Sequence, residues 1–426
     1  MSNSHYQIKH GMPDTNQYIS PDQLCVGLYV QLDLSWWEHS FAFSNFKIKD
    51  ESQLKQLRAL GLKRLRYDPA RSDCGPLALP AKVVEQAPPA PPDPQEQARQ
   101  VRVKTLSVLR KRLSEVDRAF TQASQRVKTL NQSLRNQPEE SVKQAGALVN
   151  ELVETMLGED GVALHSITGK AAEDAYVHSL NVTVLSMMLG RQLGLDSEAS
   201  HMLGMGALLH DIGKLEIPSK VLLKPPPLTR AEQQLREMHT VFGRRMGEKL
   251  MLDDDVLRII HEHHEYCDGS GYPQQLREAS IGRLSRIVCI ANHFDNLCNP
   301  LDPRTALSPH EALARMYLPQ QRVHFDEVAL KAFIRCMGVY PPGSLVQLED
   351  ERYALVLGMH PTLPMKPTLI VYDPQIPKEE ALIVNLEAEP SLTIAASVRA
   401  SQLPPEALEY LNPRQQLSYY VDPRRR

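Results

Sequence analysis

A proline-rich run between residues 87 and 94 most constrains what this sequence can fold into. Proline has a fixed φ and lacks an N–H group, so a run in which five of eight residues are proline excludes a helix interior and a central strand. We therefore interpret residues 75–95 as an extended, semi-rigid linker. The 426 residues leave room for about two to three domains, so a multidomain chain is expected.

Before the linker, residues 18–73 are typical of a small α/β domain. Leu24 to Leu34 alternates apolar and polar residues as a strand does. Glu51 to Leu60 has helical apolar spacing, with Asp50 placed to cap its first turn. Gly61 then stands where a left-handed residue commonly ends a helix.

After the linker, residues 96–136 predict one long helix. Its apolar residues recur in steps of three and four over about four heptads, which leaves two interpretations open. The helix packs on its own domain, or residues 106–134 form the seam of a parallel homodimer. The repeating positions are Leu106, Leu109, Leu113, Val116, Phe120, Ala123, Val127, Leu130 and Leu134.

The remainder of the chain changes character near residue 340. Residues 140–335 are predicted to be mostly helical, and Thr229 with Glu232 and Ser308 with Glu311 have the spacing of capping boxes. From residue 340 to 426, alternating runs bounded by Gly and Pro predict a small β-rich extension.

Composition narrows the function classes. The net charge of −3 argues against a protein that binds nucleic-acid polymers. No apolar run is long enough to span a membrane, and the first residues lack a signal-peptide pattern, so a cytoplasmic protein is expected. The scattered cysteines are interpreted as reduced thiols; they are Cys25, Cys74, Cys267, Cys289, Cys298 and Cys336.

Histidines and carboxylates gather in the helical region, which predicts a metal centre. Asp174 and His178 are four residues apart and share a helix face. In the adjacent pair His210-Asp211, the imidazole can bind one metal ion while the carboxylate bridges two. The other candidates are His239, His263 and His264.

Two neighbouring features suit a phosphorylated substrate. Lys214 follows the His-Asp pair closely and is suited to a phosphate oxygen. Residues 268–273 (DGSGYP) form a loop that can expose backbone groups and Tyr272 beside the metal ions. Because no thiolate pair is nearby, the donors favour Fe, Mn, Ni, Co or Mg over structural zinc.

These motifs, taken together and in order, resemble the HD-GYP subgroup of the HD phosphohydrolase superfamily. Residues 18–73 also resemble the small domain of unknown function that often precedes HD-GYP domains. The motifs are His178-Ser179-Leu180-Asn181-Val182, His210-Asp211-Ile212-Gly213-Lys214, His239 with Gly243, and His263-His264-Glu265 through Gly271-Tyr272-Pro273.

The resemblance implies a helical catalytic domain with two or three divalent ions, iron or manganese, that hydrolyses cyclic di-GMP to pGpG, GMP or both. It implies that Asp211 bridges two ions and that Lys214 contacts the scissile phosphate. Gly271, Tyr272 and Arg304 would also bind substrate, and the GYP loop could dock protein partners. The implied metal ligands are Asp174, His178, His210, Asp211, His239, His263, His264 and Asn292.

Two departures from the family pattern leave alternatives open. Asn292 stands where most members carry an aspartate ligand, and Leu301 stands where they usually carry an arginine. Asp295, one turn later, could compensate for Asn292. The alternatives to an active phosphodiesterase are a weak or inactive HD-GYP domain that senses cyclic di-GMP or docks a partner, and an HD hydrolase that acts on another nucleotide.

Overall fold

The chain divides into two compact units, residues 1–103 with 377–380 and residues 104–376 with 381–426. The computed structural model describes residues 17–34, 41, 43–78, 94–157, 163–166, 175–225, 227–360, 363–413 and 418–422. Most of the predicted linker, residues 79–93, lies outside the described residues. None of the helices in these ranges has both the length and the apolarity that a membrane span requires.

The first unit contains a small antiparallel sheet covered by one helix, as predicted for residues 18–73. Leu54 and Leu57 of the helix are buried in its core. The Asp50 carboxylate accepts from the Gln53 amide at 2.8 Å, and Gly61 has φ of 63°. The predicted N-cap at Asp50 and the predicted left-handed residue after the helix, Gly61, are therefore both confirmed. The elements are β1 (Gln17–Ile19), η1 (Pro21–Gln23), β2 (Tyr29–Gln31), β3 (Asn45–Lys47), α1 (Glu51–Ala59) and β4 (Leu65–Tyr67), with strand order β1-β4-β2-β3 within the described residues.

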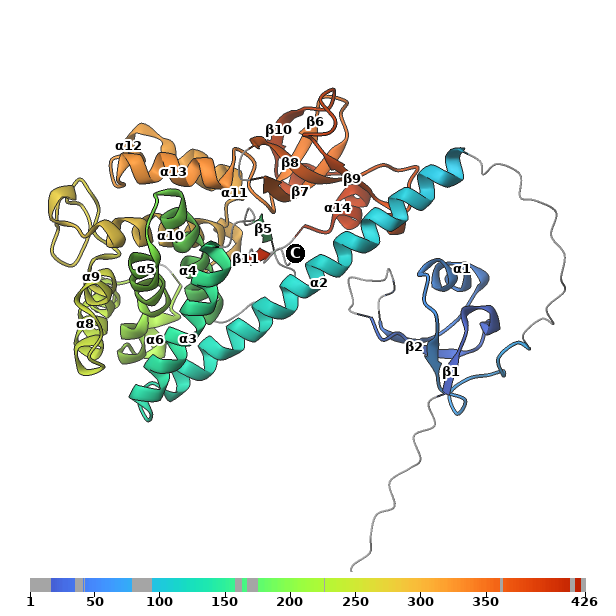
Figure 1. The fold of residues 1–426 in the computed structure, drawn as a ribbon, viewed down its shortest axis with the longest axis horizontal. Coiled ribbons are helices and arrows are strands. Elements are labelled where there is room, and N and C mark those ends of the chain that lie inside the picture. Colours follow the sequence, from blue (N-terminus) through green and yellow to red (C-terminus); the bar gives the residue numbers. More distant parts are fainter. Residues whose placement is uncertain are drawn as a thin grey trace, which may run out of the picture. The chain divides into compact units, whose positions relative to one another are not determined.

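The predicted long helix is α2 (Pro94–Ser133), which begins at the last proline of the run (Figure 1). Its heptad positions from Val116 to Leu134 are buried in the core of the second unit. The Phe120 ring lies 5.9 Å from the Tyr420 ring, edge to face. This part of the seam is thus covered by the chain's own side chains, which favours a helix packed on its own domain.

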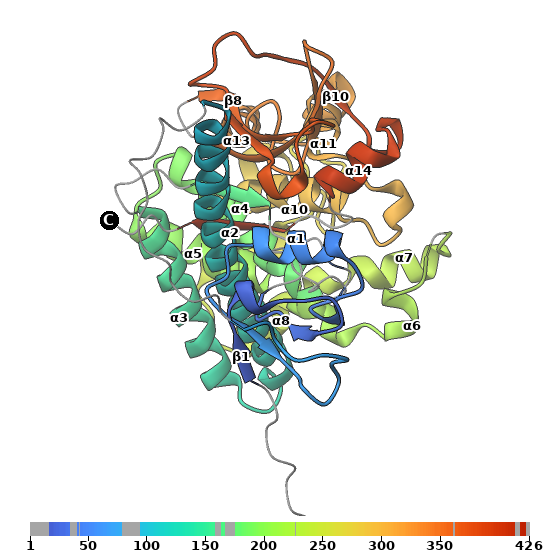
Figure 2. The same ribbon diagram turned by 90° about the vertical axis from the view of Figure 1, so that its right-hand side faces the viewer.

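The centre of the second unit is a helical bundle in which α4 packs on α5 and α10, and α9 packs on α5 and α8. Both predicted capping boxes are present, at Thr229 and Ser308. Helices α6 and α7 lie on one side of the bundle in Figure 2. The elements are α3 (Pro138–Leu157), α4 (Ala175–Gln192), α5 (Ser197–Leu209), η2 (Ile212–Glu216), α6 (Ser219–Leu222), α7 (Arg230–Glu237), α8 (His239–Lys249), α9 (Asp254–Glu262), η3 (Glu278–Ser280), α10 (Arg283–Cys298), η4 (Pro303–Thr305), α11 (Pro309–Tyr317), α12 (Pro319–Arg322) and α13 (Glu327–Met337).

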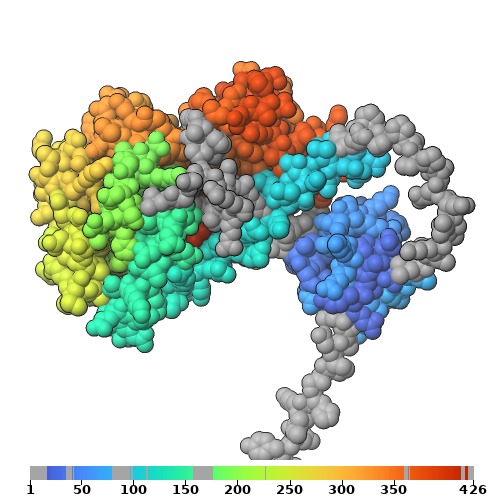
Figure 3. Space-filling view, in the orientation of Figure 1, coloured from blue at the N-terminus to red at the C-terminus, as the bar shows by residue number. Residues whose placement is uncertain are grey.

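The C-terminal region is rich in strands, as expected, but it is not a separate extension. Its antiparallel sheet includes β5 (Ala163–Ser166), which precedes the bundle in sequence and pairs with β11. Tyr419 of β11 is fully buried in the bundle core. Figure 3 shows the surface of the C-terminal region, in orange and red, beside that of the earlier parts of the second unit. The other elements are β6 (Leu345–Leu348), β7 (Tyr353–His360), β8 (Leu363–Val371), η5 (Lys378–Glu380), β9 (Leu382–Asn385), β10 (Ile394–Val398), η6 (Ala400–Gln402), α14 (Pro405–Leu411) and β11 (Tyr419–Asp422).

Candidate metal centre

Two glycines allow the segments that carry the ligands to approach each other. His210 ends α5, and Asp211 begins the short helix η2. A side chain at Gly213 would overlap the His239 carbonyl oxygen and the backbone of Gly243. The glycines of the two motifs therefore let η2 lie directly against α8, which brings Asp211 to His239.

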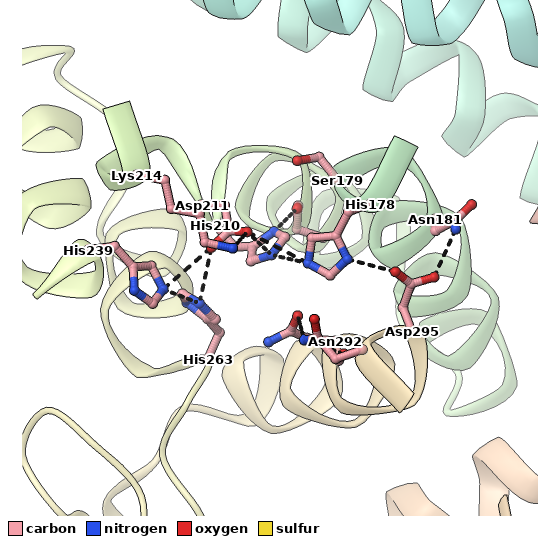
Figure 4. A network of polar contacts seen from close by, with 12 residues as sticks. His178, Ser179, Asn181, His210, Asp211, Lys214, His239, His263, Asn292 and Asp295 are labelled. Atoms are coloured by element: carbon pink, nitrogen blue, oxygen red, sulfur yellow. Dashed lines mark hydrogen bonds and ion pairs between the residues drawn. The ribbon is translucent and has the colours of Figure 1, made fainter. Parts of the chain in front are cut away.

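The structure places the ligand atoms of His178, His210 and Asp211, the first trio, within 4.8 Å of one another (Figure 4). The Nε2 atoms of His178 and His210 are 3.3 Å apart. Asp211 Oδ2 lies 3.3 Å from His210 Nε2 and 3.6 Å from His178 Nε2. One carboxylate oxygen and two imidazole nitrogens thus converge from α4, α5 and the start of η2.

His239, His263 and His264 form a second trio, whose ligand atoms also lie within 4.8 Å of one another. His239 begins α8, and His263 follows the last residue of α9. Their Nε2 atoms are 3.2 Å apart. Burial lowers the pKa of His239 to about 4 and holds the pKa values of His263 and His264 well below the usual range. All three imidazoles are therefore neutral at pH 7.

Asp211 contributes to both trios. Its Oδ2 faces the first trio, while its Oδ1 lies 3.4 Å from His239 Nε2 and 3.9 Å from His263 Nε2. Lys214 Nζ donates to Oδ2 at 2.5 Å. Burial raises the pKa of Asp211, but Lys214 and His210 outweigh burial, and the pKa lies well below the usual range. Asp211 is thus an ionised carboxylate between two groups of imidazoles.

The orientation of the second trio's histidines fits a bound cation. His239 Nδ1 donates to the Arg236 carbonyl oxygen at 2.7 Å, and His263 Nδ1 donates to the Ile260 carbonyl oxygen at 3.0 Å. A neutral imidazole carries one proton, so both Nε2 atoms present lone pairs to each other. In addition, Asp211 Oδ1 is buried without a hydrogen-bond partner. Facing lone pairs and an orphaned carboxylate oxygen are the donor set that a divalent ion satisfies.

A chain of polar groups supports the first trio. His178 Nδ1 donates to Asp295 Oδ2 at 2.6 Å, and Asn181 Nδ2 donates to Asp295 Oδ1 at 2.8 Å. The Asn181 side-chain oxygen in turn accepts from the Tyr419 amide at 3.1 Å. This chain fixes the His178 ring so that Nε2 points at the other ligands, which is a common arrangement around metal-binding histidines (Figure 4).

The GYP loop is anchored beside the second trio. The buried Glu265 carboxylate accepts from the Gln274 amide at 2.5 Å and from the Leu276 amide at 2.9 Å. A side chain at Gly271 would overlap the backbone of Tyr266 and His264. The Tyr272 ring stacks on His264 with centroids 4.6 Å apart. Residues 268–273 therefore form a loop, as predicted, and this loop places Tyr272 against the candidate ligand His264.

No contact with either trio is described for three residues that the sequence predicts for the site. Asp174 lies outside the described residues. Asn292 is buried on α10, where its Oδ1 accepts from Asn296 Nδ2 at 2.8 Å. The Arg304 side chain is 89% exposed and forms an ion pair with Asp302 at 2.8 Å. The described contacts of Asn292 and Arg304 thus lie within their own helix and loop.

Sequence reasoning missed the supporting residues. The sequence indicates Asp295 only as a substitute ligand for Asn292. In the structure, the Asp295 carboxylate accepts from His178 Nδ1 and so orients this imidazole. The anchoring role of Glu265 was not foreseen, although this acid directly follows the His263-His264 pair. An acidic residue next to predicted ligands is the one signal that could have indicated such a role.

The comparisons with known proteins agree with this site. The family described as "HD domain" matches residues 164–328, and the family described as "Domain of unknown function (DUF3391)" matches residues 16–145. The chain is 29% identical over 361 residues to the cyclic di-GMP phosphodiesterase PA4108 of Pseudomonas aeruginosa, which covers 82% of this chain and 83% of that protein.

Two further relatives match a shorter part of the chain. The cyclic di-GMP phosphodiesterase response regulator RpfG of Xanthomonas campestris is 36% identical over 35% of this chain and 39% of its own length. The 3′3′-cGAMP-specific phosphodiesterase 1 of Vibrio cholerae is 32% identical over 35% of this chain and 34% of its own length.

The chain therefore contains an HD domain preceded by a DUF3391 domain, and over most of its length it is similar to a cyclic di-GMP phosphodiesterase. An HD domain binds divalent metal ions, in agreement with the two trios. The resemblance read from the motifs is confirmed.

Proposed function

We propose that this protein is a metal-dependent phosphodiesterase that hydrolyses cyclic di-GMP to pGpG, GMP or both. The observation that carries the proposal is the pair of neutral imidazoles whose Nε2 atoms face each other at 3.2 Å beside the ionised Asp211. The names of two relatives, both cyclic di-GMP phosphodiesterases, support the choice of substrate.

The ligand set that we propose consists of both trios, with Asp211 shared between them and Asp174 and Asn292 as additional ligands. Bound ions would supply a water molecule of lowered pKa and would offset charge on the phosphate. We propose two or three ions. The donors, imidazole and carboxylate without thiolate, favour Fe, Mn, Ni, Co or Mg, and the family resemblance favours iron or manganese among these.

The chain's own residues would bind and orient the substrate. Lys214 is one-third exposed, so its ammonium group can reach a phosphate oxygen while it remains next to Asp211. Tyr272 and the backbone at Gly271 border the second trio and would contact the nucleotide. Arg304 is exposed, and it would bind a phosphate only by leaving Asp302. Protein partners would dock at the GYP loop, residues 268–273.

A second candidate function rests on Asn292. An asparagine brings no negative charge to the ligand set, and its side-chain oxygen is already bonded to Asn296. A domain with a weakened metal site could bind cyclic di-GMP without turning it over, and so act as a sensor. The cGAMP-specific relative raises a further alternative, a different cyclic dinucleotide as substrate.

One experiment separates these functions. The full chain is purified anaerobically, its metal content is measured, and it is incubated with cyclic di-GMP and with 3′3′-cGAMP. We expect about two metal ions per chain and faster hydrolysis of cyclic di-GMP. The variant carrying His210→Ala and Asp211→Ala should lose both metal and turnover.

Each other outcome has a distinct meaning. Bound metal and bound nucleotide without turnover would establish the sensor. Faster hydrolysis of 3′3′-cGAMP would replace the proposed substrate. Full turnover by the double variant would overturn the metal centre itself.

We also propose that the protein is cytoplasmic. The six free cysteines support this location, because thiols stay reduced in that compartment.

A further inference from the structure

Two thiols of the first unit are in contact. The Sγ atoms of Cys25 and Cys74 are 3.1 Å apart, although the residues are 49 positions apart in sequence. All six cysteines lie in the described part of the chain and are free, and among them this is the one pair whose sulfur atoms touch. The HD domain and its metal ligands play no part in this contact.

Main-chain hydrogen bonds hold the two segments together on both sides of the thiols. The Asp73 amide donates to the Gly27 carbonyl oxygen at 2.9 Å, and the Leu77 amide donates to the Gln23 carbonyl oxygen at 2.9 Å. The Gly27 amide is also fixed, because it donates to the Ile48 carbonyl oxygen at 2.8 Å. The proximity of the sulfur atoms is therefore built into the backbone of the unit.

Gly27 leaves the room that the thiols occupy. Its φ of +100° favours glycine, and a Cβ atom there would lie 3.3 Å from Cys74 Sγ. Each thiol also donates to a carbonyl oxygen, Cys25 to Gly75 at 3.4 Å and Cys74 to Val26 at 3.2 Å, and Cys25 packs against the core of the unit. Thiols are weak donors, so these contacts contribute little stability. The arrangement is better explained by reactivity than by bonding.

Among the six thiols, which all lie in the described ranges, Cys74 is the exposed one, while Cys25, Cys267 and Cys336 are half-buried. Cys289 and Cys298 are buried. Burial raises the pKa values of Cys267 and Cys336 to about 12, which keeps these thiols protonated and slow to react. An oxidant in solution therefore meets Cys74 first.

We propose that Cys25 and Cys74 are a redox modification site, at which a peroxide converts the two thiols into a reversible intramolecular disulfide. The Cys74 thiolate attacks one peroxide oxygen, the O–O bond breaks, hydroxide leaves, and Cys74 becomes a sulfenic acid. The Cys25 sulfur then attacks the Cys74 sulfur, and the departing hydroxide takes the Cys25 proton to form water. In total two thiols are oxidised and one hydrogen peroxide is reduced to two water molecules.

The order of the steps follows from the surroundings of Cys25. Burial, followed by the neighbouring Cys74 thiol, raises the pKa of Cys25 to about 11, so Cys25 is the resolving thiol. Bond formation needs the sulfur atoms to approach by about 1 Å, which side-chain rotation can supply. The bond closes a loop that contains β2, β3, α1 and β4, so it constrains the unfolded chain of this unit.

The test uses the full chain with hydrogen peroxide as the probe. After treatment, catalase is added, the protein is denatured and alkylated, and its peptides are analysed by mass spectrometry. We expect two fewer alkylated cysteines, a linked peptide pair that contains Cys25 and Cys74, and full reversal by dithiothreitol. A rise in the thermal midpoint of the first unit should accompany the bond.

Matched variants make the outcome decisive. Cys25→Ser and Cys74→Ser should each abolish the linked peptides, whereas Cys336→Ser should leave them unchanged. Sulfinic acid at Cys74 without a link, a disulfide between two chains, or loss of two thiols in Cys25→Ser would each overturn the proposal. Phosphodiesterase activity is not a readout here, so this test and that of the proposed function fail independently.

Discussion

The two trios of the metal centre are held by different kinds of support. In the first trio, His178 is oriented by the side chain of Asp295, which belongs to another helix. In the second trio, His239 and His263 are oriented by main-chain carbonyl oxygens three residues earlier in their own segments. His210 of the first trio is oriented in the same local way, because its Nδ1 donates to the Ala207 carbonyl oxygen at 2.7 Å. The first trio therefore depends on tertiary packing through His178, while no such dependence is described for His239 and His263.

This difference has a consequence for charge. The first trio is surrounded by two carboxylates, Asp211 and Asp295, whereas the ligands of the second trio are all neutral imidazoles. A cation held by the second trio would be balanced mainly by Asp211 Oδ1, which lies 3.4 Å from His239 Nε2. Among the described candidate ligands, Asp211 is thus the one whose charge faces both trios, and the trios should respond differently to substitutions elsewhere.

The largest effect is expected from Asp211→Asn, which keeps the shape of the side chain and removes the shared charge. Both trios should lose metal, and turnover of cyclic di-GMP should fall by about a thousandfold or more. Metal analysis and steady-state kinetics check this. Glu198→Gln, an exposed change on α5, is the control and should match the wild type. Full metal content in Asp211→Asn would show that the halves are independent.

Gly271→Ala should affect the second trio without removing a ligand. The added methyl group overlaps the backbone of Tyr266 and His264, so Tyr272 must move away from His264. We expect kcat/KM to fall by about 10- to 100-fold while the metal content stays near that of the wild type. Gln274→Ala changes an exposed side chain of the same loop and should have little effect. Equal loss in both variants would contradict the role of the close backbone contact.

Asp295→Asn should weaken the first trio alone. His178 loses the carboxylate that fixes its ring, and metal affinity should fall by about 10- to 100-fold at one site. A metal titration that resolves two classes of site measures this fall in affinity. Asn181→Ala removes a hydrogen-bond donor to Asp295, and it should lower metal affinity at the same site by a smaller factor. If both classes of site weaken equally, the proposed division of the centre is wrong.

The smallest effect is expected from Asn292→Asp. The new carboxylate can still accept from Asn296, so the fold should tolerate it. Added negative charge should raise metal affinity by about tenfold or less, and turnover should rise with it. Asn296→Asp, one turn further along α10, serves as the control for charge alone. No change in metal affinity would show that Asp211 and the imidazoles already suffice.

The parts of this structure that sequence predicted well are those set by local spacing. The capping residues Asp50, Thr229 and Ser308 were predictable because a helix end needs a side-chain acceptor for its free amides. The His210-Asp211 pair and the GYP loop were recognisable for the same reason, since their spacing is short. Fold class and domain order followed from the linker and from periodicity.

The parts that sequence could not predict depend on contacts between distant segments. A heptad repeat does not reveal whether its partner is a second chain or the chain's own core, so the packing of Phe120 had to come from the structure. Likewise, nothing near residue 165 indicates that β5 pairs with β11. The contact between Asp295 and His178 spans 117 positions and has no local signal.

The hydrogen bond from the Tyr419 amide to Asn181 can form only late in the synthesis of the chain. The two residues are 238 positions apart, and both trios lie within the span between Asn181 and Tyr419 or just before it. A growing chain therefore carries every residue of the two trios well before it carries the strand that completes the support of His178. The support that the Tyr419 amide gives to Asn181, and through Asp295 to His178, can therefore form only after β11 has left the ribosome.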